Sequence, residues 1–161
     1  METQGLNLFI VDDNRSMVFA LKHYLTNKFG GKLKITTFYD GESCLKNINE
    51  QTDVVILDYN LNGKNGNEIL KEIKELNPRI EVIMLSSNEN VETAVEAFRL
   101  GAKNYVVKNP NSWRKLNLLI NTIFMQPMRL LREFGVAKFI NIFILTFITM
   151  GALVLLILKL R

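Results

Sequence analysis

Cysteine is almost absent from this chain. Among its 161 residues there is one, Cys44. A single cysteine excludes an internal disulfide and a zinc site built on cysteine ligands. Because Cys44 is spaced as on one face of a helix with Leu45 and Ile48, we interpret it as a small core residue of an amphipathic helix.

The first 125 residues also lack an excess of basic charge. In residues 1–125, 15 Lys and Arg balance 15 Asp and Glu, whereas residues 126–161 carry five basic residues against Glu133 alone, so the net charge of +4 belongs to the tail. A nucleic-acid-binding domain would show a basic stripe on its folded part, so we expect no nucleic-acid partner. Basic residues beside an apolar segment favour contact with membrane lipid instead.

The N-terminus lacks the pattern of a secretory signal. No basic stretch followed by an apolar stretch occurs at Met1 to Gln4. We therefore expect the folded part of the chain to lie in the cytoplasm.

What the sequence does contain is five short apolar runs that alternate with segments of helical period. The runs are Leu6–Val11, Leu33–Phe38, Val54–Leu57, Glu81–Leu85 and Asn104–Val107. Continuous apolar runs are typical of parallel strands that are buried on both faces. Five strands alternating with five helices predict a three-layer α/β domain built on a doubly wound parallel sheet.

Between the runs, apolar residues recur every three or four positions, which predicts one buried stripe on each helix. Three of these predicted stripes are Val18, Leu21, Leu25 and Phe29, then Ile69, Ile73 and Leu76, and then Val91, Ala94, Val95 and Phe98.

Four of the five apolar runs end on a polar side chain. The polar residues are Asp12 and Asp13 after the first run, Asp58 after the third, Ser86 after the fourth and Lys108 after the fifth. Because the carboxyl ends of parallel strands meet at one edge of a sheet, these groups should lie together where ligands bind. Three carboxylates, a hydroxyl and an ammonium group suggest a magnesium-assisted phosphoryl site.

With these positions the chain resembles the receiver domain of two-component response regulators, a flavodoxin-like fold with strand order 2-1-3-4-5. The resemblance covers about residues 5–125. It rests on the five polar positions in their order, and also on Val91–Gly101 and Gly101–Lys108.

The resemblance implies a role for each of these positions. Asp58 would be the phosphoacceptor, whose carboxylate forms an aspartyl phosphate. Lys108 would pair with one phosphoryl oxygen as a point charge, and Ser86 would donate a hydrogen bond to another. Tyr105 would be a switch residue that turns inward when the hydroxyl group moves toward the phosphate. The groups that would hold Mg²⁺, an ion that prefers oxygen ligands, are Asp12, Asp13, Asp58 and the backbone carbonyl of Asn60.

Simpler interpretations of these residues stay open. Asp12 and Asp13 could cap the first helix. Ser87 could replace Ser86 as the hydroxyl donor, although the strand end favours Ser86. Tyr105 could be an ordinary strand aromatic.

The phosphoryl group would have to come from another protein. The single histidine, His23, falls on the first predicted helix, away from the strand ends, so we interpret it as a partly buried or surface residue. The chain is then neither a histidine kinase nor a histidine phosphotransfer protein. The resemblance implies one of these as the phosphodonor partner.

Two departures from the family pattern affect the expected site. Asn109 follows Lys108 where the family usually has proline. Either the Lys108–Asn109 peptide bond stays trans and the side chain of Lys108 points in a different direction, or the bond is cis at a high energetic cost and the site carries strain. Asn62 stands where proline is also common. If these departures disable the site, a docking domain that works without phosphate remains.

The tail has the length of a membrane span. From Phe139 to Leu158 there are 20 residues without a charge. At about 1.5 Å rise per residue this is about 30 Å of helix, enough to cross a bilayer core. Thr146 and Thr149 can satisfy their hydroxyl groups within such a helix. Gly151 offers a small surface for helix pairing and leaves homodimerisation open.

The sequence therefore predicts a receiver domain at 1–125, a juxtamembrane segment at 126–138, a transmembrane helix at 139–158 and a short tail at 159–161. We expect the receiver to face the cytoplasm at the inner membrane, without an output domain of its own. Its phosphorylation would switch a surface that binds an unknown effector protein. The alternative is a phosphate sink or shuttle without an effector. A hydrolase with an aspartyl-phosphate intermediate is disfavoured, because Asn60 stands where such enzymes often have a second carboxylate.

Overall fold

The structure of the chain, a computed structural model, describes residues 5–124, 140–141 and 143–150. Contacts divide the chain into two units, residues 1–120 and residues 121–161. The expected division at residue 125 is not tested by this boundary and stays a prediction.

The first unit alternates strands and helices, as the apolar runs predict. Its elements, with α5 extending into the second unit, are β1 (Leu6–Val11), α1 (Arg15–Phe29), a 3-10 turn η1 (Gly30–Lys32), β2 (Leu33–Phe38), α2 (Gly41–Asn47), β3 (Val54–Asp58), α3 (Gly66–Leu76), β4 (Glu81–Ser86), α4 (Val91–Arg99), β5 (Asn104–Val107) and α5 (Ser112–Phe124). The strands form one parallel sheet in the order β2-β1-β3-β4-β5. The predicted α/β class and the strand order are therefore confirmed.

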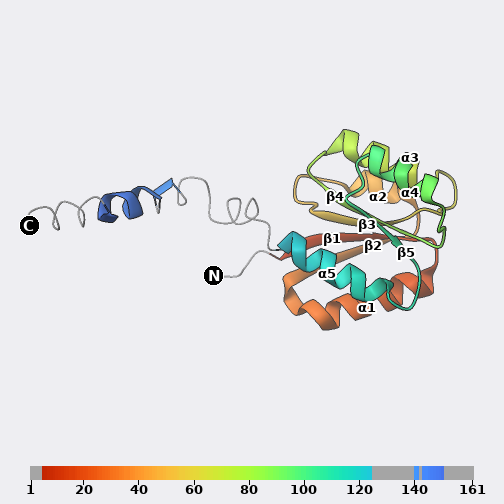
Figure 1. Cartoon of the computed structure of the whole chain (residues 1–161). Coiled ribbons are helices and arrows are strands. Elements are labelled where there is room, and N and C mark those ends of the chain that lie inside the picture. Colours follow the sequence, from red (N-terminus) through yellow and green to blue (C-terminus); the bar gives the residue numbers. More distant parts are fainter. Residues whose placement is uncertain (1–4, 125–139, 142, 151–161) are drawn as a thin grey trace, which may run out of the picture. The chain divides into compact units, whose positions relative to one another are not determined.

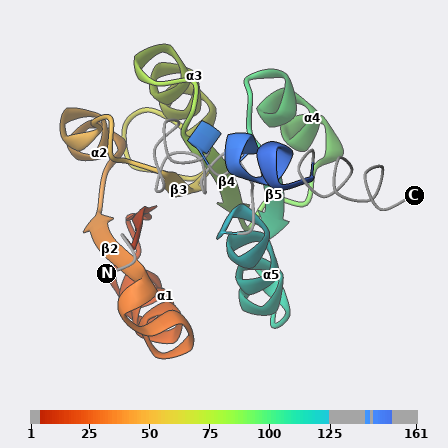
Figure 2. The ribbon, with the colours of Figure 1, turned by 90° about the vertical axis from the view of Figure 1, so that its left-hand side faces the viewer.

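Helices cover both faces of this sheet. Figure 1 and Figure 2 show α1 and α5 on one face and α2, α3 and α4 on the other. This arrangement explains the continuous apolar runs, because every residue of β3 is buried and β4 is buried from Val82 onward.

Helix α1 behaves as its sequence predicts. Its four stripe residues, Val18, Leu21, Leu25 and Phe29, are all buried. The helix begins after Asn14, whose side chain accepts a hydrogen bond of 3.1 Å from the Met17 backbone N–H. Burial of one apolar stripe is the main source of stability of such a helix.

Helix α4 does not follow the prediction. The side chains of Val91, Val95 and Phe98 are 74%, 42% and 50% exposed, and the residue that α4 buries is Ala97. Periodicity indicates that a stripe exists on a helix, but not which neighbour covers it. The prediction for Leu76, the last residue of α3, is also wrong, since this side chain is 61% exposed.

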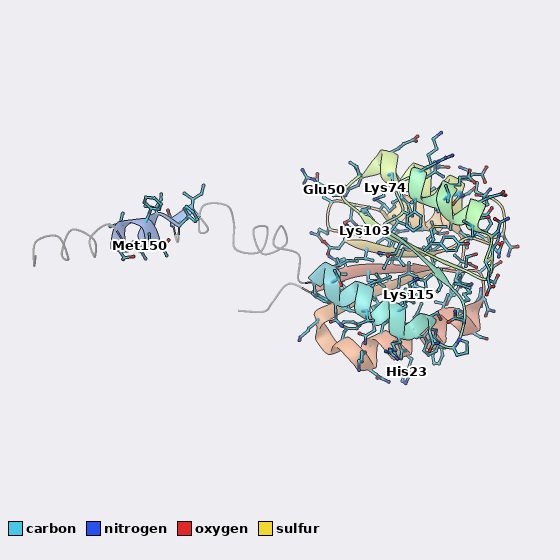
Figure 3. The ribbon with its side chains drawn as sticks, in the orientation of Figure 1. His23, Glu50, Lys74, Lys103, Lys115 and Met150 are labelled. Carbon is cyan, nitrogen blue, oxygen red and sulfur yellow. The ribbon has the colours of Figure 1, made fainter. Side chains whose placement is uncertain are left out.

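In the second unit, residues 140–141 and 143–150 are helical with exposed side chains, and Met150 is labelled in Figure 3. The hydroxyl group of Thr146 donates to the carbonyl oxygen of Phe143 at 2.8 Å, and that of Thr149 donates to Thr146 at 2.9 Å, which confirms the prediction for both threonines. No helix within the described residues is long and apolar enough to cross a membrane. The whole predicted juxtamembrane segment 126–138, parts of the predicted span 139–158 and the tail 159–161 lie outside the described residues.

Candidate functional site

The carboxyl ends of the strands bring the predicted polar groups to one edge of the sheet. Asp58 ends β3 and pairs in register with Leu85 of β4, so Ser86 follows directly beside it. Ser86 pairs in turn with Val107 of β5, the residue before Lys108. Residues that are far apart in sequence therefore become neighbours through strand pairing alone.

Three carboxylates form the centre of the site. Asp12, Asp13 and Asp58 each place an oxygen atom within 4.8 Å of the others. Asp12 and Asp58 are only 2% and 3% exposed, and Asp13 is half-buried. Three like charges at this separation repel one another, so the site requires a cation.

Lys108 supplies one such cation from β5. Its Nζ lies 2.7 Å from Asp12 Oδ2 and 2.9 Å from Asp58 Oδ2. Its backbone N–H donates to the carbonyl oxygen of Ser86 at 2.7 Å, which fixes the start of the side chain. The ammonium group thus joins the ends of β1 and β3.

Burial and the contacts with Lys108 act in opposite directions on the pKa of Asp58, as burial and the two carboxylates do on the pKa of Lys108. Burial raises the pKa of Asp58 above its usual value, although the hydrogen bond and charge of Lys108 oppose this rise. For Lys108, burial alone would lower the pKa, but its hydrogen bonds to Asp12 and Asp58 outweigh burial and raise it. Lys108 therefore stays positively charged beside the carboxylates.

One oxygen of the central carboxylate has no hydrogen-bonding partner. Asp58 Oδ1 is buried and accepts no hydrogen bond from any described residue. An unpaired buried oxygen beside two further carboxylates suits an oxygen-binding cation such as Mg²⁺. The position of the Asn60 backbone carbonyl as a fourth ligand stays a prediction.

Asp12 and Asp13 do not cap the first helix. The cap is Asn14, and Asp12 Oδ1 accepts a hydrogen bond of 2.9 Å from the backbone N–H of Asn14. Both aspartates therefore remain available to the acidic site. The alternative that Asp12 and Asp13 simply cap the first helix is wrong.

The two candidate hydroxyl groups have different environments. Ser86 is fully buried, and its Oγ accepts a hydrogen bond of 3.0 Å from the Asn88 backbone N–H. Ser87 Oγ instead accepts from Asn60 Nδ2 at 3.1 Å. Both hydroxyl groups keep their hydrogen available for a ligand, but Ser86 directly follows the strand residue that pairs with Asp58, which makes it the stronger candidate donor.

Asn88 is a connecting residue whose role the sequence did not show. Its carbonyl oxygen accepts the hydroxyl hydrogen of Tyr105 at 2.8 Å, and its Nδ2 donates to Thr93 Oγ1 of α4 at 3.2 Å. Tyr105 is 8% exposed, so its ring is turned inward. Asn88 thus links Ser86, α4 and β5. In the sequence, the only indication of this role was its position two residues after Ser86.

The loop after Lys108 stays trans. No cis peptide bond occurs among the described residues. Asn109 organises the loop, because its carbonyl oxygen accepts from the N–H and the hydroxyl group of Ser112 at 3.0 Å and 2.8 Å. Asparagine in the place of proline is therefore compatible with a lysine that reaches both carboxylates.

Gly66 lets the start of α3 approach the site. A Cβ atom at this position would lie 2.5 Å from the carbonyl oxygen of Asp58 and 2.7 Å from the Cα atom of Tyr59. Such contacts are far inside van der Waals distance, so any other residue would displace the backbone beside Asp58.

Residues 8–120 match the family described as the response regulator receiver domain. The chain belongs to this family. Receiver domains are signalling modules rather than enzymes, they accept a phosphoryl group on an aspartate, and they interact with histidine kinases. The cluster of Asp12, Asp13 and Asp58 is typical of the Mg²⁺ site of receivers.

Curated relatives are longer than this receiver. The transcriptional regulatory protein ZraR of Escherichia coli K12 is 34% identical over 109 residues, which are 67% of this chain and 24% of that protein. The chain thus spans about a quarter of the length of the curated relatives it matches.

Solved receiver structures have the same fold. The BeF3-activated receiver domain of DrrB, a Thermotoga maritima protein, is 28% identical with a TM-score of 0.68 over 76% of this chain and 100% of that one. A chain of the CheX-CheY-BeF3-Mg²⁺ complex from Borrelia burgdorferi is 27% identical with a TM-score of 0.67, over 76% of this chain and 92% of that one.

The histidine of this receiver lies away from the acidic cluster. His23 is exposed on α1, on the outer side of the helix in Figure 3, and its Nε2 is 2.9 Å from Asn27 Nδ2. Its interpretation as a surface residue is therefore confirmed.

Proposed function

We propose that this protein is a membrane-tethered response regulator receiver that accepts a phosphoryl group on Asp58 from a histidine kinase or phosphotransfer protein. The observation that carries the proposal is the arrangement at Asp58. One of its oxygens is paired with Lys108, and the other is buried without a partner beside two further carboxylates.

Asp58 is the nucleophile of this reaction. One of its carboxylate oxygens forms a bond to phosphorus while the bond from phosphorus to the donor nitrogen breaks. Lys108 is already within ion-pair distance of the carboxylate, so it is placed to pair with a phosphoryl oxygen. Ser86 donates its hydroxyl hydrogen to another oxygen of the group.

The ion that suits this site is Mg²⁺. Asp12, Asp13, Asp58 and the Asn60 backbone carbonyl would hold it, with Asp12 acting largely through water. When bound, the ion neutralises part of the charge that gathers as the anionic phosphoryl group meets the carboxylate. Lys108 would remain beside Asp58 and pair with an oxygen of the phosphoryl group.

Phosphorylation changes a surface that binds an effector protein. Ser86 and Tyr105 both hydrogen-bond to Asn88, so a change at Ser86 reaches the switch tyrosine. The surface consists of α4, β5 and α5. Its exposed apolar residues, Val91, Val95, Phe98 and Leu118, support a role in binding.

The membrane tether is the predicted span at 139–158. Its described part carries no charge and is mostly apolar, with Ile140, Phe143, Leu145 and Phe147 each at least half exposed. An uncharged, mostly apolar helix suits a lipid environment. The threonine hydroxyl groups are satisfied within the helix, which removes their cost in hydrocarbon. The receiver then faces the cytoplasm, where ATP-derived phosphodonors occur.

Phosphorylation is tested on the full-length chain in detergent. It is incubated with acetyl phosphate, with and without Mg²⁺, and followed over time by phosphate-affinity gel shift. Asp58→Ala is the test variant. Asp40→Asn is the matched control, because Asp40 caps α2 and asparagine retains that capping role.

We expect a Mg²⁺-dependent shift in the natural chain and in Asp40→Asn, and none in Asp58→Ala. A shift that persists in Asp58→Ala would overturn the assignment of the phosphoacceptor. No shift in the natural chain would favour the docking domain that works without phosphate. A shift that decays quickly, with no partner that depends on it, would favour the sink or shuttle.

The tether is tested by extraction of membranes with alkaline carbonate. The full-length chain should stay in the membrane pellet, and a variant without residues 139–158 should appear in the supernatant. Release of the full-length chain by carbonate would rule out the span.

A further inference from the structure

Charge is distributed unevenly between the two edges of the sheet. Because the strands are parallel, each crossover helix begins at the carboxyl edge, where the acidic site lies, and ends at the amino edge, where the strands begin. The first turns of α2, α3 and α4 each carry a glutamate, and the last turns of α1, α2, α3 and α4 each carry a lysine or an arginine. The charges of residues 1–125 sum to zero, but they are separated along the strand direction.

The amino edge carries a group of exposed basic side chains, which we call the basic edge. Its members lie at the ends of helices and in the turns before strands, and they are Lys28, Lys32, Lys46, Arg79, Arg99 and Lys103. Figure 3 shows Lys103 on this side of the receiver. The helix dipole favours basic residues at helix ends, but Arg79 and Lys103 lie in turns outside the helices. The dipole alone therefore does not account for the basic edge.

Acidic residues at the same edge offset only part of this charge. They are Glu50, Asp53, Glu75 and Glu81. Two of them are engaged within the receiver, because Asp53 Oδ2 accepts a hydrogen bond of 3.0 Å from the Asn7 backbone N–H and Glu81 Oε1 lies 3.5 Å from Lys103 Nζ. The exposed basic residues outnumber the acidic ones, so the edge as a whole is positive.

The chain leaves the receiver at this edge. Helix α5 ends at Phe124 on the side where the strands begin, as Figure 1 shows. Residues 125–138 separate Phe124 from the predicted span at 139–158. Even a fully extended chain of this length reaches at most about 50 Å. A receiver tethered through these residues therefore stays near the membrane, and its point of attachment lies on the basic edge.

We propose that the basic edge rests on the anionic lipid headgroups of the membrane that holds the chain, so that the acidic edge with Asp58 faces the cytoplasm and the phosphodonor. The inference rests on the proposed membrane tether, but not on phosphorylation. A flat lipid surface suits these side chains, because they come from helices on both faces of the sheet.

Electrostatic attraction to lipid is strong enough to orient a tethered domain. Each lysine or arginine close to an anionic leaflet strengthens the contact about fivefold. The tether makes the contact intramolecular, so even a weak attraction per residue is sufficient. The acidic edge is repelled by the same surface, which favours the same orientation.

The test places a fluorophore on either edge of the full-length chain in lipid nanodiscs. Gln51→Cys marks the basic edge and Asn62→Cys marks the acidic edge, and both positions are exposed. Cys44 is buried, and burial raises its pKa to about 12, so it does not compete for a thiol-reactive label. Quenching by spin-labelled headgroups is measured in discs of phosphatidylcholine, with and without added phosphatidylserine.

Two triple variants show whether the basic edge is responsible. The test variant combines Lys32→Gln, Arg79→Gln and Lys103→Gln. The matched control loses the same charge at exposed positions away from the basic edge, through Lys22→Gln, Lys71→Gln and Arg114→Gln.

We expect phosphatidylserine to increase quenching at position 51 at least about twofold, and not to increase it at position 62. High salt should remove the increase, because it screens exposed charges. The test variant should lose the increase, and the control variant should keep it. An equal increase at both positions, or a test variant that behaves like the control, would overturn the proposal.

Assembly into discs of phosphatidylcholine alone separates the tether from the orientation. Neutral lipid does not attract the basic edge, so a chain that stays out of these discs lacks the tether, and that part of the proposed function fails. The basic edge is then tested by cosedimentation of both triple variants with vesicles that contain phosphatidylserine. Weaker binding of the test variant would support the lipid contact, and equal binding of the two would overturn it.

Discussion

Helices α1 and α4 carry the same kind of apolar stripe and use it in opposite ways. In α1 the stripe is buried against the sheet, and in α4 the side chains of Val91, Val95 and Phe98 remain exposed. Both helices begin with an asparagine cap, so their local signals are also alike. The difference lies in what covers each stripe.

This comparison shows that the same apolar periodicity can mark a buried face or an exposed one. In α1 the stripe contributes to folding. In α4 it contributes little to folding and is available for binding. Substitutions in the two helices should therefore separate into effects on stability and effects on binding.

The largest effect is expected from Leu21→Ala in α1. Leu21 is fully buried, so its truncation removes buried apolar area and leaves a cavity. The free energy of unfolding should fall by about 2–5 kcal/mol, measured by urea titration. The control is Phe19→Ala on the same helix, at a side chain that is 73% exposed. Equal losses in both variants would contradict the burial pattern of α1.

The next largest effect is expected from Ala97→Leu in α4. Ala97 is fully buried, so a larger side chain must push α4 outward. Overpacking of this kind costs about 1–3 kcal/mol, which urea titration would detect. No loss of stability would contradict the close packing around Ala97.

A gain in stability is expected from Asp58→Asn, because the site is not arranged for stability. Burial raises the pKa of Asp58 in the folded state, so its ionised form opposes folding above that raised pKa. Without metal at pH 7, the variant should gain about 1 kcal/mol in free energy of unfolding. The gain should shrink as the pH falls through the raised pKa, where the natural side chain becomes neutral in the folded state, and vanish below the usual pKa of an aspartate, where it is neutral in both states.

Addition of Mg²⁺ provides the control for this prediction. Binding to the folded state stabilises the natural chain in proportion to the logarithm of metal concentration, and Asp58→Asn should gain less. An equal gain in both proteins would place the metal away from Asp58.

The smallest effect on stability is expected from Phe98→Ser in α4. Half of this side chain is already exposed, so the free energy of unfolding should change by less than about 0.5 kcal/mol. Urea titration beside Leu21→Ala makes the comparison direct. A loss as large as that of Leu21→Ala would mean that the chain itself covers the stripe of α4.

Much of the fold could be predicted because the positions of strands and helices depend on patterns that are local in sequence. The apolar runs predicted the strands, and the residues at their ends predicted the edge where Asp12, Asp13, Asp58 and Lys108 meet. The order of the strands came from resemblance to a family, since periodicity alone does not determine which strands are neighbours.

Other features depend on packing that no local pattern encodes. Asparagine in a helix usually faces water, so nothing in the sequence indicated that Asn67 is buried without partners. The exposed stripe of α4 has the same periodicity as a buried one. The hydrogen bonds of Asn88 join three elements that are adjacent only in the folded chain.

The exposed stripe of α4 also has an evolutionary consequence. Val91, Val95 and Phe98 contribute little to folding, so under the proposed function selection on them comes almost entirely from the partner that binds α4. A duplicated gene could therefore exchange these side chains and acquire a new partner while the phosphorylation chemistry stays the same. The exposed face of α4 can therefore diverge in sequence independently of the phosphorylation site.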